Sequence, residues 1–429
     1  MAIVACSTPP GRSGIAVVRL SGKNSNKIVK TLICGHALKR KHLRPELVDI
    51  VDKKNRTFDR AVITQYLSPN SYTGEDIVEI SCHGNPVIIS NIIDLCLDAG
   101  ATIAEPGEFT KKAFLSGKMD LSEAESVSSI IHAKSLAGVR AGVKNLKGSL
   151  SGSVFKIKKK IIGLIASLEF NLDISEEDLQ PNIIKNTLRG VKSQALILKS
   201  CVKSFRESQF FQDGASVVLA GPPNAGKSTL FNALINKKQS IVTSEEGTTR
   251  DVVEKSLFIK QLPVMLKDTA GIRAGKSEAE KQGVLKSKEE VLGADLVIMF
   301  DKKPKKPKNN YLYVFNKSDI KKTEDDYDIY ISAKENINIE KLRNLVYKKL
   351  VGDDFSVGEV LLTSKRQLSS VLGASKHLEK ASLLLKNKNS LELVVEDLNL
   401  CVKELDKITK KTTRDDILNS VFSSFCVGK

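Results

Sequence analysis

Residues 221–228 read Gly-Pro-Pro-Asn-Ala-Gly-Lys-Ser, and they directly follow the apolar run 217–220. A buried strand that breaks into Gly-x-x-x-x-Gly-Lys-Ser and then into a helix is the setting of the phosphate-binding P-loop. The glycines let successive backbone N–H groups converge on phosphates, and the helix points its positive end at them. We expect Lys227 to contact the terminal phosphates and the Ser228 hydroxyl to reach Mg²⁺. The stretch therefore predicts a nucleoside triphosphate site.

Two further strand ends identify the base and the metal. Asp268 follows the apolar residues 264–266 and opens Asp-Thr-Ala-Gly, which supplies a carboxylate near the metal and a glycine near the γ-phosphate. Asp319 closes Asn-Lys-Ser-Asp after the run 312–315. Its carboxylate can accept two hydrogen bonds from guanine, whereas adenine offers neither donor on that edge. The sequence therefore predicts GTP as the nucleotide.

Two loops complete the expected nucleotide site. Ser332-Ala333-Lys334 follows the run 329–331 as the last base-contacting loop, and residues 247–251 form a switch whose Thr249 closes on Mg²⁺. The residues that we expect at the nucleotide are Asn224, Ala225, Gly226, Lys227, Ser228, Thr229, Asp268, Thr269, Ala270, Gly271, Asn316, Lys317, Ser318, Asp319, Ser332, Ala333 and Lys334. Five motifs in GTPase order are a specific signal.

The composition limits the class of protein. A chain of 429 residues is too long for one core and fits two to four domains. The net charge of +17 favours a polyanionic partner such as RNA, or it reflects a lysine-rich bias on solvated faces. Seven scattered cysteines without a Cys-x-x-Cys pair argue against disulfides and zinc. No signal peptide and no apolar run of about 20 residues is visible, so we expect a cytoplasmic protein.

The hydrophobic pattern divides the chain. Short apolar runs and one helix at residues 86–99 predict an α+β domain over residues 1–118. Apolar residues at spacings of three and four predict an all-α domain over 119–212 and 357–429, with an acidic interruption at 169–178. This helical domain is split by an inserted α/β P-loop GTPase domain at 213–356. The free C-terminus is expected to fray.

Three side chains have two readings at this stage. Arg19 and Glu79 lie within predicted strands, where a charged side chain faces solvent or lines a pocket, and the residues alone favour the solvent face. Cys426 is read as an inert small apolar residue rather than a nucleophile.

The segment 301–310 departs from the usual GTPase pattern. A crossover helix normally joins two parallel strands here, but two prolines and a lysine run make a poor helix. We expect an extended basic loop that leaves one sheet face partly uncovered and so weakens the domain. The loop either touches an RNA partner or is what a deletion left, and the second reading is favoured.

The whole chain resembles the tRNA-modification GTPases of the MnmE/TrmE family. The resemblance rests on residues 8–16, 71–76, 83–84, 106–110, 113–121 and 426–429, together with the GTPase motifs. It implies a homodimer that forms through an N-terminal domain resembling folate-dependent aminomethyltransferases. By matching motifs, Arg19, Glu79, Lys118 and the terminal Lys429 would bind a reduced folate, either 5-formyl- or methylene-tetrahydrofolate, which reverses the solvent-face reading.

The resemblance also implies partners and a reaction. The family works with the FAD-dependent protein MnmG in a heterotetrameric complex and adds an aminomethyl-type group to carbon 5 of the wobble uridine of tRNA. No membrane partner is expected. The alternative from the residues is a ribosome-assembly GTPase without covalent chemistry, although no appended KH module follows the GTPase motifs. A folate-dependent aminomethyltransferase merely regulated by GTP is a third reading.

The hydrolytic machinery is expected to differ from that of many GTPases. Ile272 stands where a water-orienting Gln often lies, so the resemblance assigns Glu280 to this role through bridging water, against the reading of a solvated helix glutamate. Arg273 and Arg250 could be imagined as arginine fingers, and Arg250 stays unassigned. The resemblance further implies that K⁺ is held by Asn224 and by Thr243, Glu245 and Thr248. It also implies that GTP hydrolysis is coupled to pairing of two G domains. The nucleotide-contacting loop would comprise Thr243, Ser244, Glu245, Glu246, Gly247, Thr248 and Thr249.

Overall fold

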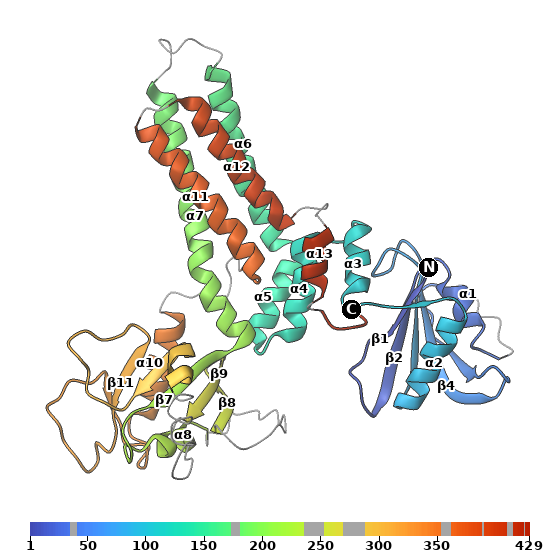
Figure 1. The fold of residues 1–429 in the computed structure, drawn as a ribbon, viewed down its shortest axis with the longest axis horizontal. Helices are drawn as coiled ribbons and strands as arrows, with labels where there is room; N and C mark the ends of the chain where they lie inside the picture. Colours follow the sequence, from blue (N-terminus) through green and yellow to red (C-terminus); the bar gives the residue numbers. More distant parts are fainter. Residues whose placement is uncertain are drawn as a thin grey trace. The chain divides into compact units, whose positions relative to one another are not determined.

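The computed structural model describes residues 1–34, 41–172, 181–235, 253–268, 288–352, 362–387, 390–409, 415–423 and 425–429. The chain divides into two compact units, and Figure 1 labels their helices and strands. The first comprises Met1–Ser128, Asn145–Gly190 and Lys376–Lys429, and the second comprises Ser129–Lys144 and Val191–Ser375. The three-domain division at residues 118, 213 and 356 stays a prediction.

The first unit opens with a six-stranded sheet in the order β3-β4-β5-β2-β1-β6. Its strands are β1 (Ile3–Cys6), β2 (Ser13–Ser21), β3 (Glu46–Val51), β4 (Thr57–Tyr66), β5 (Ile77–Gly84) and β6 (Thr102–Ile103). All neighbours are antiparallel except β1 and β6, which are parallel. Buried and more exposed residues alternate along β4, as expected for strands with one covered face.

Helices cover one face of this sheet. They are α1 (Ser25–Lys30) and α2 (Pro86–Asp98). Helix α3 (Glu108–Leu115) lies on the other face, where its Phe109 packs with Ile3 and Ala5 of β1. The Asn85 side chain accepts the Val87 N–H, which caps the start of α2. Ile92 of α2 packs in one apolar core with Val18 and Ile80 of the strands. Because side chains alternate along a strand, Arg19 and Glu79 lie on the opposite face. The predicted α+β domain is confirmed.

Amphipathic helices make up the predicted all-α regions. They are α4 (Leu121–His132), α5 (Leu136–Leu146), α6 (Ser149–Leu172), α7 (Pro181–Asp213), α11 (Lys365–Lys386), α12 (Leu391–Thr409) and α13 (Asp415–Phe422). In the first unit, α6 and α12 lie side by side (Figure 1), and Lys158 forms an ion pair with Asp406 across them. The acidic interruption predicted at 169–178 starts too early in the chain, because α6 continues through Glu169 to Leu172. Residues 173–178 lie outside the described residues. A helix whose apolar stripe is already packed can carry one exposed glutamate.

The second unit contains a sheet in the order β12-β11-β10-β7-β9-β8. Its strands are β7 (Ala215–Ala220), β8 (Val253–Ile259), β9 (Leu262–Asp268), β10 (Leu296–Met299), β11 (Tyr311–Phe315) and β12 (Ile329–Tyr330). Only β8 and β9 pair antiparallel. Helices α8 (Lys227–Ile235) and α10 (Ile339–Val351) pack against one core of this unit, with Leu230 and Leu342 fully buried. This is the predicted α/β GTPase architecture.

The segment 301–310 forms no helix, as predicted. The expected exposure of one sheet face is wrong, however, because Val218 and Val297 are 0% exposed. They pack with Tyr311 and Tyr313, whose rings lie on the same face. The loop is attached to this region by its lysines: Lys303 pairs with Asp328 at 2.9 Å. Val291 and Ala294, which precede β10, and Tyr327 pack in the same cluster, so this sheet face is buried without a crossover helix.

Candidate functional site

The P-loop joins the end of β7 to the start of α8, so the N-terminus of a helix faces the phosphate position. Asn224 and Gly226 adopt left-handed backbone conformations, with φ of 60° and 90°. A Cβ built at Gly226 would lie 2.2 Å from Nδ2 of Asn316. Glycine is therefore required at 226 for both conformation and space.

Lys227 is held inside this loop. Its side-chain Nζ donates to the carbonyl oxygens of Gly221 and Pro222, each at 2.9 Å. Burial lowers the pKa of Lys227, and the negative charge of Asp268 opposes this shift. The ammonium group therefore lies in the loop at the place where the sequence predicts phosphate.

Ser228 and Asp268 meet as the sequence predicts. Ser228 Oγ donates to Asp268 Oδ2 at 2.8 Å, although the two residues belong to α8 and β9. Asp268 is 3% exposed. A hydroxyl and a carboxylate are oxygen donors of the kind that Mg²⁺ prefers, so this pair fits the metal.

Asn316 ties the base-recognition segments to the P-loop. Its Nδ2 donates to the Ala225 carbonyl at 3.0 Å, and its Oδ1 accepts the backbone N–H of Ala333 at 3.0 Å. Lys317 Nζ donates to the Asn224 carbonyl at 2.9 Å. Three motifs that are far apart in the sequence thus form one structure.

The rest of the base-contacting segments lie at the same end of the sheet. The Ser318 N–H donates to the Ile331 carbonyl at 3.0 Å, which holds the two base-contacting loops together. Asp319 and Lys334 are exposed, while Ser332 is fully buried. The carboxylate expected to select guanine is therefore accessible.

Several predicted residues lie outside the described residues. They are Thr243, Ser244, Glu245, Glu246, Gly247, Thr248, Thr249, Arg250, Thr269, Ala270, Gly271, Ile272, Arg273 and Glu280. The assigned roles of the switch, the potassium loop and the water-orienting glutamate remain predictions.

A second polar site lies on the strand face of the first unit. The register of β2 and β5 places Arg19 directly opposite Glu79. Arg19 Nε donates to Glu79 Oε1 at 2.8 Å, and Tyr66 donates its hydroxyl to Glu79 Oε2 at 3.1 Å. Burial and the Glu79 charge raise the pKa of Tyr66. Arg19 and Glu79 are therefore partners in a half-buried site.

The C-terminal residues dock beside this pair. Arg19 Nη1 and Ser7 Oγ both donate to the Gly428 carbonyl at 3.0 Å. A Cβ at Gly428 would lie 2.7 Å from the Cys6 carbonyl oxygen, so the tail approaches β1 closely. The expected fraying of the C-terminus is wrong, because buried Phe425 and these hydrogen bonds hold it. Cys426 is exposed, and Lys429 is half-buried.

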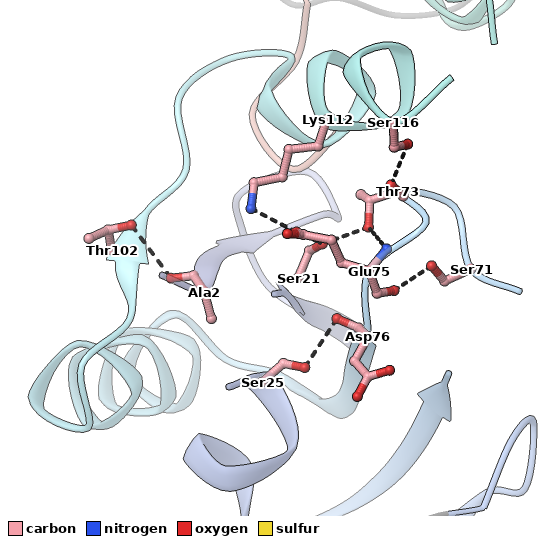
Figure 2. Close-up of polar contacts among 10 residues, drawn as sticks. All are labelled: Ala2, Ser21, Ser25, Ser71, Thr73, Glu75, Asp76, Thr102, Lys112 and Ser116. Atoms are coloured by element: carbon pink, nitrogen blue, oxygen red, sulfur yellow. Dashed lines mark hydrogen bonds and ion pairs between the residues drawn. The ribbon is translucent and has the colours of Figure 1, made fainter. Parts of the chain in front are cut away.

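The motif 71–76 adjoins the same face of β2 (Figure 2). Ser21, two residues after Arg19, shares a 2.7 Å hydrogen bond with the Thr73 hydroxyl and donates to Glu75 at 3.3 Å. Lys112 of α3 pairs with Glu75 at 2.8 Å. A Cβ at Gly74 would lie 3.4 Å from Lys118 Cε, so Lys118 lies against this motif. The motif thus links Lys118 to the Arg19 strand.

The sequence missed several contributors to this site. Tyr66 contacts Glu79, and Ser7 contacts the Gly428 carbonyl of the tail. Phe109 lies beneath Arg19, with the guanidinium carbon 5.7 Å from the ring centre. Two sequence features could have pointed to these residues. Phe109 lies within the motif 106–110, and Tyr66 lies at the end of a strand.

Comparisons with known proteins identify the family of the chain. A family model described as the GTP-binding protein TrmE N-terminus matches residues 2–118, and one described as the MnmE helical domain matches residues 121–426. The tRNA modification GTPase MnmE of Thermoanaerobacter pseudethanolicus is 36% identical over 455 residues, covering 100% of this chain and 99% of that protein. The protein of the same name from Thermotoga maritima is 35% identical over 455 residues, with the same coverage.

Among the described helices, none is long and apolar enough to span a bilayer. The two family models together cover nearly the whole chain, and the relatives align over their full length. The resemblance stated from the motifs is confirmed, and the chain belongs to the family of the tRNA modification GTPase MnmE.

Proposed function

We propose that this protein is the GTP-hydrolysing component of a system that modifies carbon 5 of the wobble uridine in tRNA. The observation that carries the GTPase part is Asn316, which hydrogen-bonds to the P-loop through Ala225 and to the last base loop through Ala333. This one side chain joins the phosphate-binding and base-binding segments. The names of the full-length relatives support tRNA as the object of the modification.

The residues of the nucleotide site have distinct roles in this proposal. Lys227 exchanges its carbonyl partners for phosphate oxygens, and Asp319 accepts two hydrogen bonds from guanine. Ser228, Asp268 and Thr249 would hold Mg²⁺, which offsets negative charge on the phosphates when bound. Glu280 orients the attacking water.

Potassium is the second expected cation. Asn224 is exposed in the P-loop, and its amide oxygen is a suitable ligand. Thr243, Glu245 and Thr248 would complete the shell. Bound K⁺ offsets charge that develops on the phosphates. Pairing of two G domains would order the loop 243–248, so GTP hydrolysis would depend on the homodimer.

The Arg19 site suits a reduced folate. Arg19, Lys118 and Lys429 are cations that suit a glutamylated ligand, and the Glu79 carboxylate can accept hydrogen bonds from the donor edge of a pterin. The donor set therefore fits 5-formyl- or methylene-tetrahydrofolate, which supplies the one-carbon unit when bound. Cys426 is an exposed residue of the docked tail, and its thiol is accessible for further chemistry.

The proposed partners are a second copy of this chain, the FAD-dependent protein MnmG in a heterotetrameric complex, and tRNA. The proposed location is the cytoplasm. The high positive charge of the chain is consistent with an RNA substrate.

The test is nucleoside mass spectrometry of tRNA from bacteria that lack their own family member. Expression of this protein should restore the modified wobble uridine, and the Lys227→Ala variant should not, since it loses the phosphate-binding ammonium. A soluble GTP-hydrolysing protein that restores nothing and co-purifies with ribosomal subunits would instead support a ribosome-assembly function.

A further inference from the structure

The outward face of α6 carries an unusual combination of side chains. Gly152, Phe155, Lys156, Lys159, Lys160 and Gly163 form this surface, which we call the α6 basic face. At about 100° per residue they fall within an arc of about 140°. The opposite face packs toward α12 (Figure 1), where Val154, Ile157 and Ile161 are buried. The α6 basic face therefore points away from the apolar core of the helix pair.

Its charge is not balanced along the helix. Within α6, residues 149–168 contain four lysines and no aspartate or glutamate, and Glu169 is the one acidic residue of the helix. Only Lys158 turns inward, where it pairs with Asp406 of α12. Lys156, Lys159 and Lys160 are all exposed. The helix thus presents a concentrated positive charge on one side.

Phe155 stands within these lysines. It is 65% exposed, and Lys159, four residues further along, is its neighbour on the helix surface. Ile162, one turn beyond Lys159, is 50% exposed. An accessible aromatic ring beside lysines is the combination by which proteins stack on bases while they contact the backbone.

Two glycines leave the backbone of this face open. A Cβ built at Gly152 or at Gly163 would meet nothing within 4 Å. Glycine is a poor helix former, so neither position is explained by helix stability or by packing. The two lie eleven residues apart, about 16 Å along the helix, on either side of the lysines. They allow a bulky ligand to approach the helix closely.

We propose that the α6 basic face binds the phosphate backbone of RNA, with the lysines on phosphates and Phe155 stacked on an accessible base. The proposal rests on the proposed function, which makes tRNA the RNA concerned. A protein partner fits less well, because lysine is depleted in protein interfaces and here occupies three of the six positions. Charge complementarity favours a polyanion.

The experiment measures binding of an unmodified tRNA transcript to the full-length protein by fluorescence anisotropy at several salt concentrations. Lys156→Glu with Lys159→Glu should weaken binding at least tenfold and reduce the slope of log affinity against log salt by about two. Phe155→Ala should weaken binding at least fivefold without changing that slope, because stacking releases no counterions.

The matched control reverses the same amount of charge elsewhere in the helical part. Lys376 and Lys386 are exposed residues of α11, so the double change to glutamate at these positions should leave binding within about twofold. Circular dichroism and the basal GTPase rate of each variant report whether it is folded. Equal weakening by the control would show that net charge, not this face, determines binding.

Two other outcomes would overturn the proposal. Unchanged tRNA binding by the α6 variants would show that RNA binds elsewhere on the protein. The proposed function would still stand in that case, provided that the unaltered protein binds and modifies tRNA. Unchanged tRNA binding together with lost association with the flavoprotein would make this face a protein-docking surface. Absence of tRNA binding by the unaltered protein would count against the proposed function itself.

Discussion

Arg19 and Glu79 oppose each other across the β2–β5 ladder, and two guanidinium nitrogens of Arg19 lie 2.8 and 2.7 Å from one Glu79 oxygen. The remaining Arg19 nitrogen donates to the docked C-terminal tail. The pair therefore joins the sheet to the last residues of the chain.

Glu79→Ala removes the only carboxylate that contacts Arg19 among the described residues. It should reduce the free energy of unfolding by about 1–3 kcal/mol, because a half-buried guanidinium loses its partner. It should also abolish binding of 5-formyltetrahydrofolate. Urea denaturation and calorimetry measure the two effects. Arg56→Ala breaks an exposed ion pair with Asp52 and should change neither, and a Glu79→Ala protein that binds folate normally would remove Glu79 from that site.

Gly226→Ala should disrupt the nucleotide site. The new methyl group would displace Asn316 from the P-loop and would require a left-handed conformation for alanine. We expect GTP affinity to fall by about 100-fold or more, since several phosphate and base contacts are lost together. A fluorescent GTP analogue measures this. Gly293→Ala, where a Cβ meets nothing within 4 Å, is the control and should bind normally.

Asp319→Asn should change the base preference from guanine toward xanthine. The amide presents a donor where the carboxylate accepts, which matches the carbonyl oxygen at position 2 of xanthine. GTP hydrolysis at limiting substrate should fall by about 100-fold, while XTP hydrolysis should rise. Steady-state kinetics with both nucleotides measures the two hydrolysis rates. An equal loss of GTP and XTP hydrolysis would indicate a structural defect instead.

Thiol labelling should separate the cysteines by burial. Burial raises the pKa of Cys82 to about 11 and those of Cys96 and Cys401 to about 12. A raised pKa keeps these groups as neutral thiols as pH rises toward those values, and only the thiolate reacts. From pH 7 to 9 the native protein should therefore label at exposed Cys34 and Cys426 and not at these three. Mass spectrometry of digests locates the label, and rapid labelling of Cys96 would contradict the packed core.

Hydrolysis of GTP should be faster in K⁺ than in Na⁺ at matched ionic strength. Asn224→Ala should remove most of this difference while retaining GTP binding, because it deletes one proposed potassium ligand. Phosphate-release assays in the two salts measure it. Equal rates in both salts for the unaltered protein would exclude the potassium role.

Much of this protein could be predicted from local sequence. The P-loop depends on glycines and on a strand and helix that adjoin it in the chain, so its form follows from contiguous residues. The helix predicted at 86–99 is observed as α2 (Pro86–Asp98), since periodicity and breakers act over a few residues. The fold class and family followed from these signals.

Long-range packing decided the rest. Whether Arg19 faces solvent depends on the register that sets it against Glu79, and whether the tail frays depends on Gly428 reaching Ser7 and Arg19. The sheet face at Val218 and Val297 is buried by a cluster that includes Ala294 and Tyr311, although the local sequence shows only a missing crossover helix. These contacts join residues that are distant in the chain. Their free energy depends on burial and on partners that exist only in the folded structure.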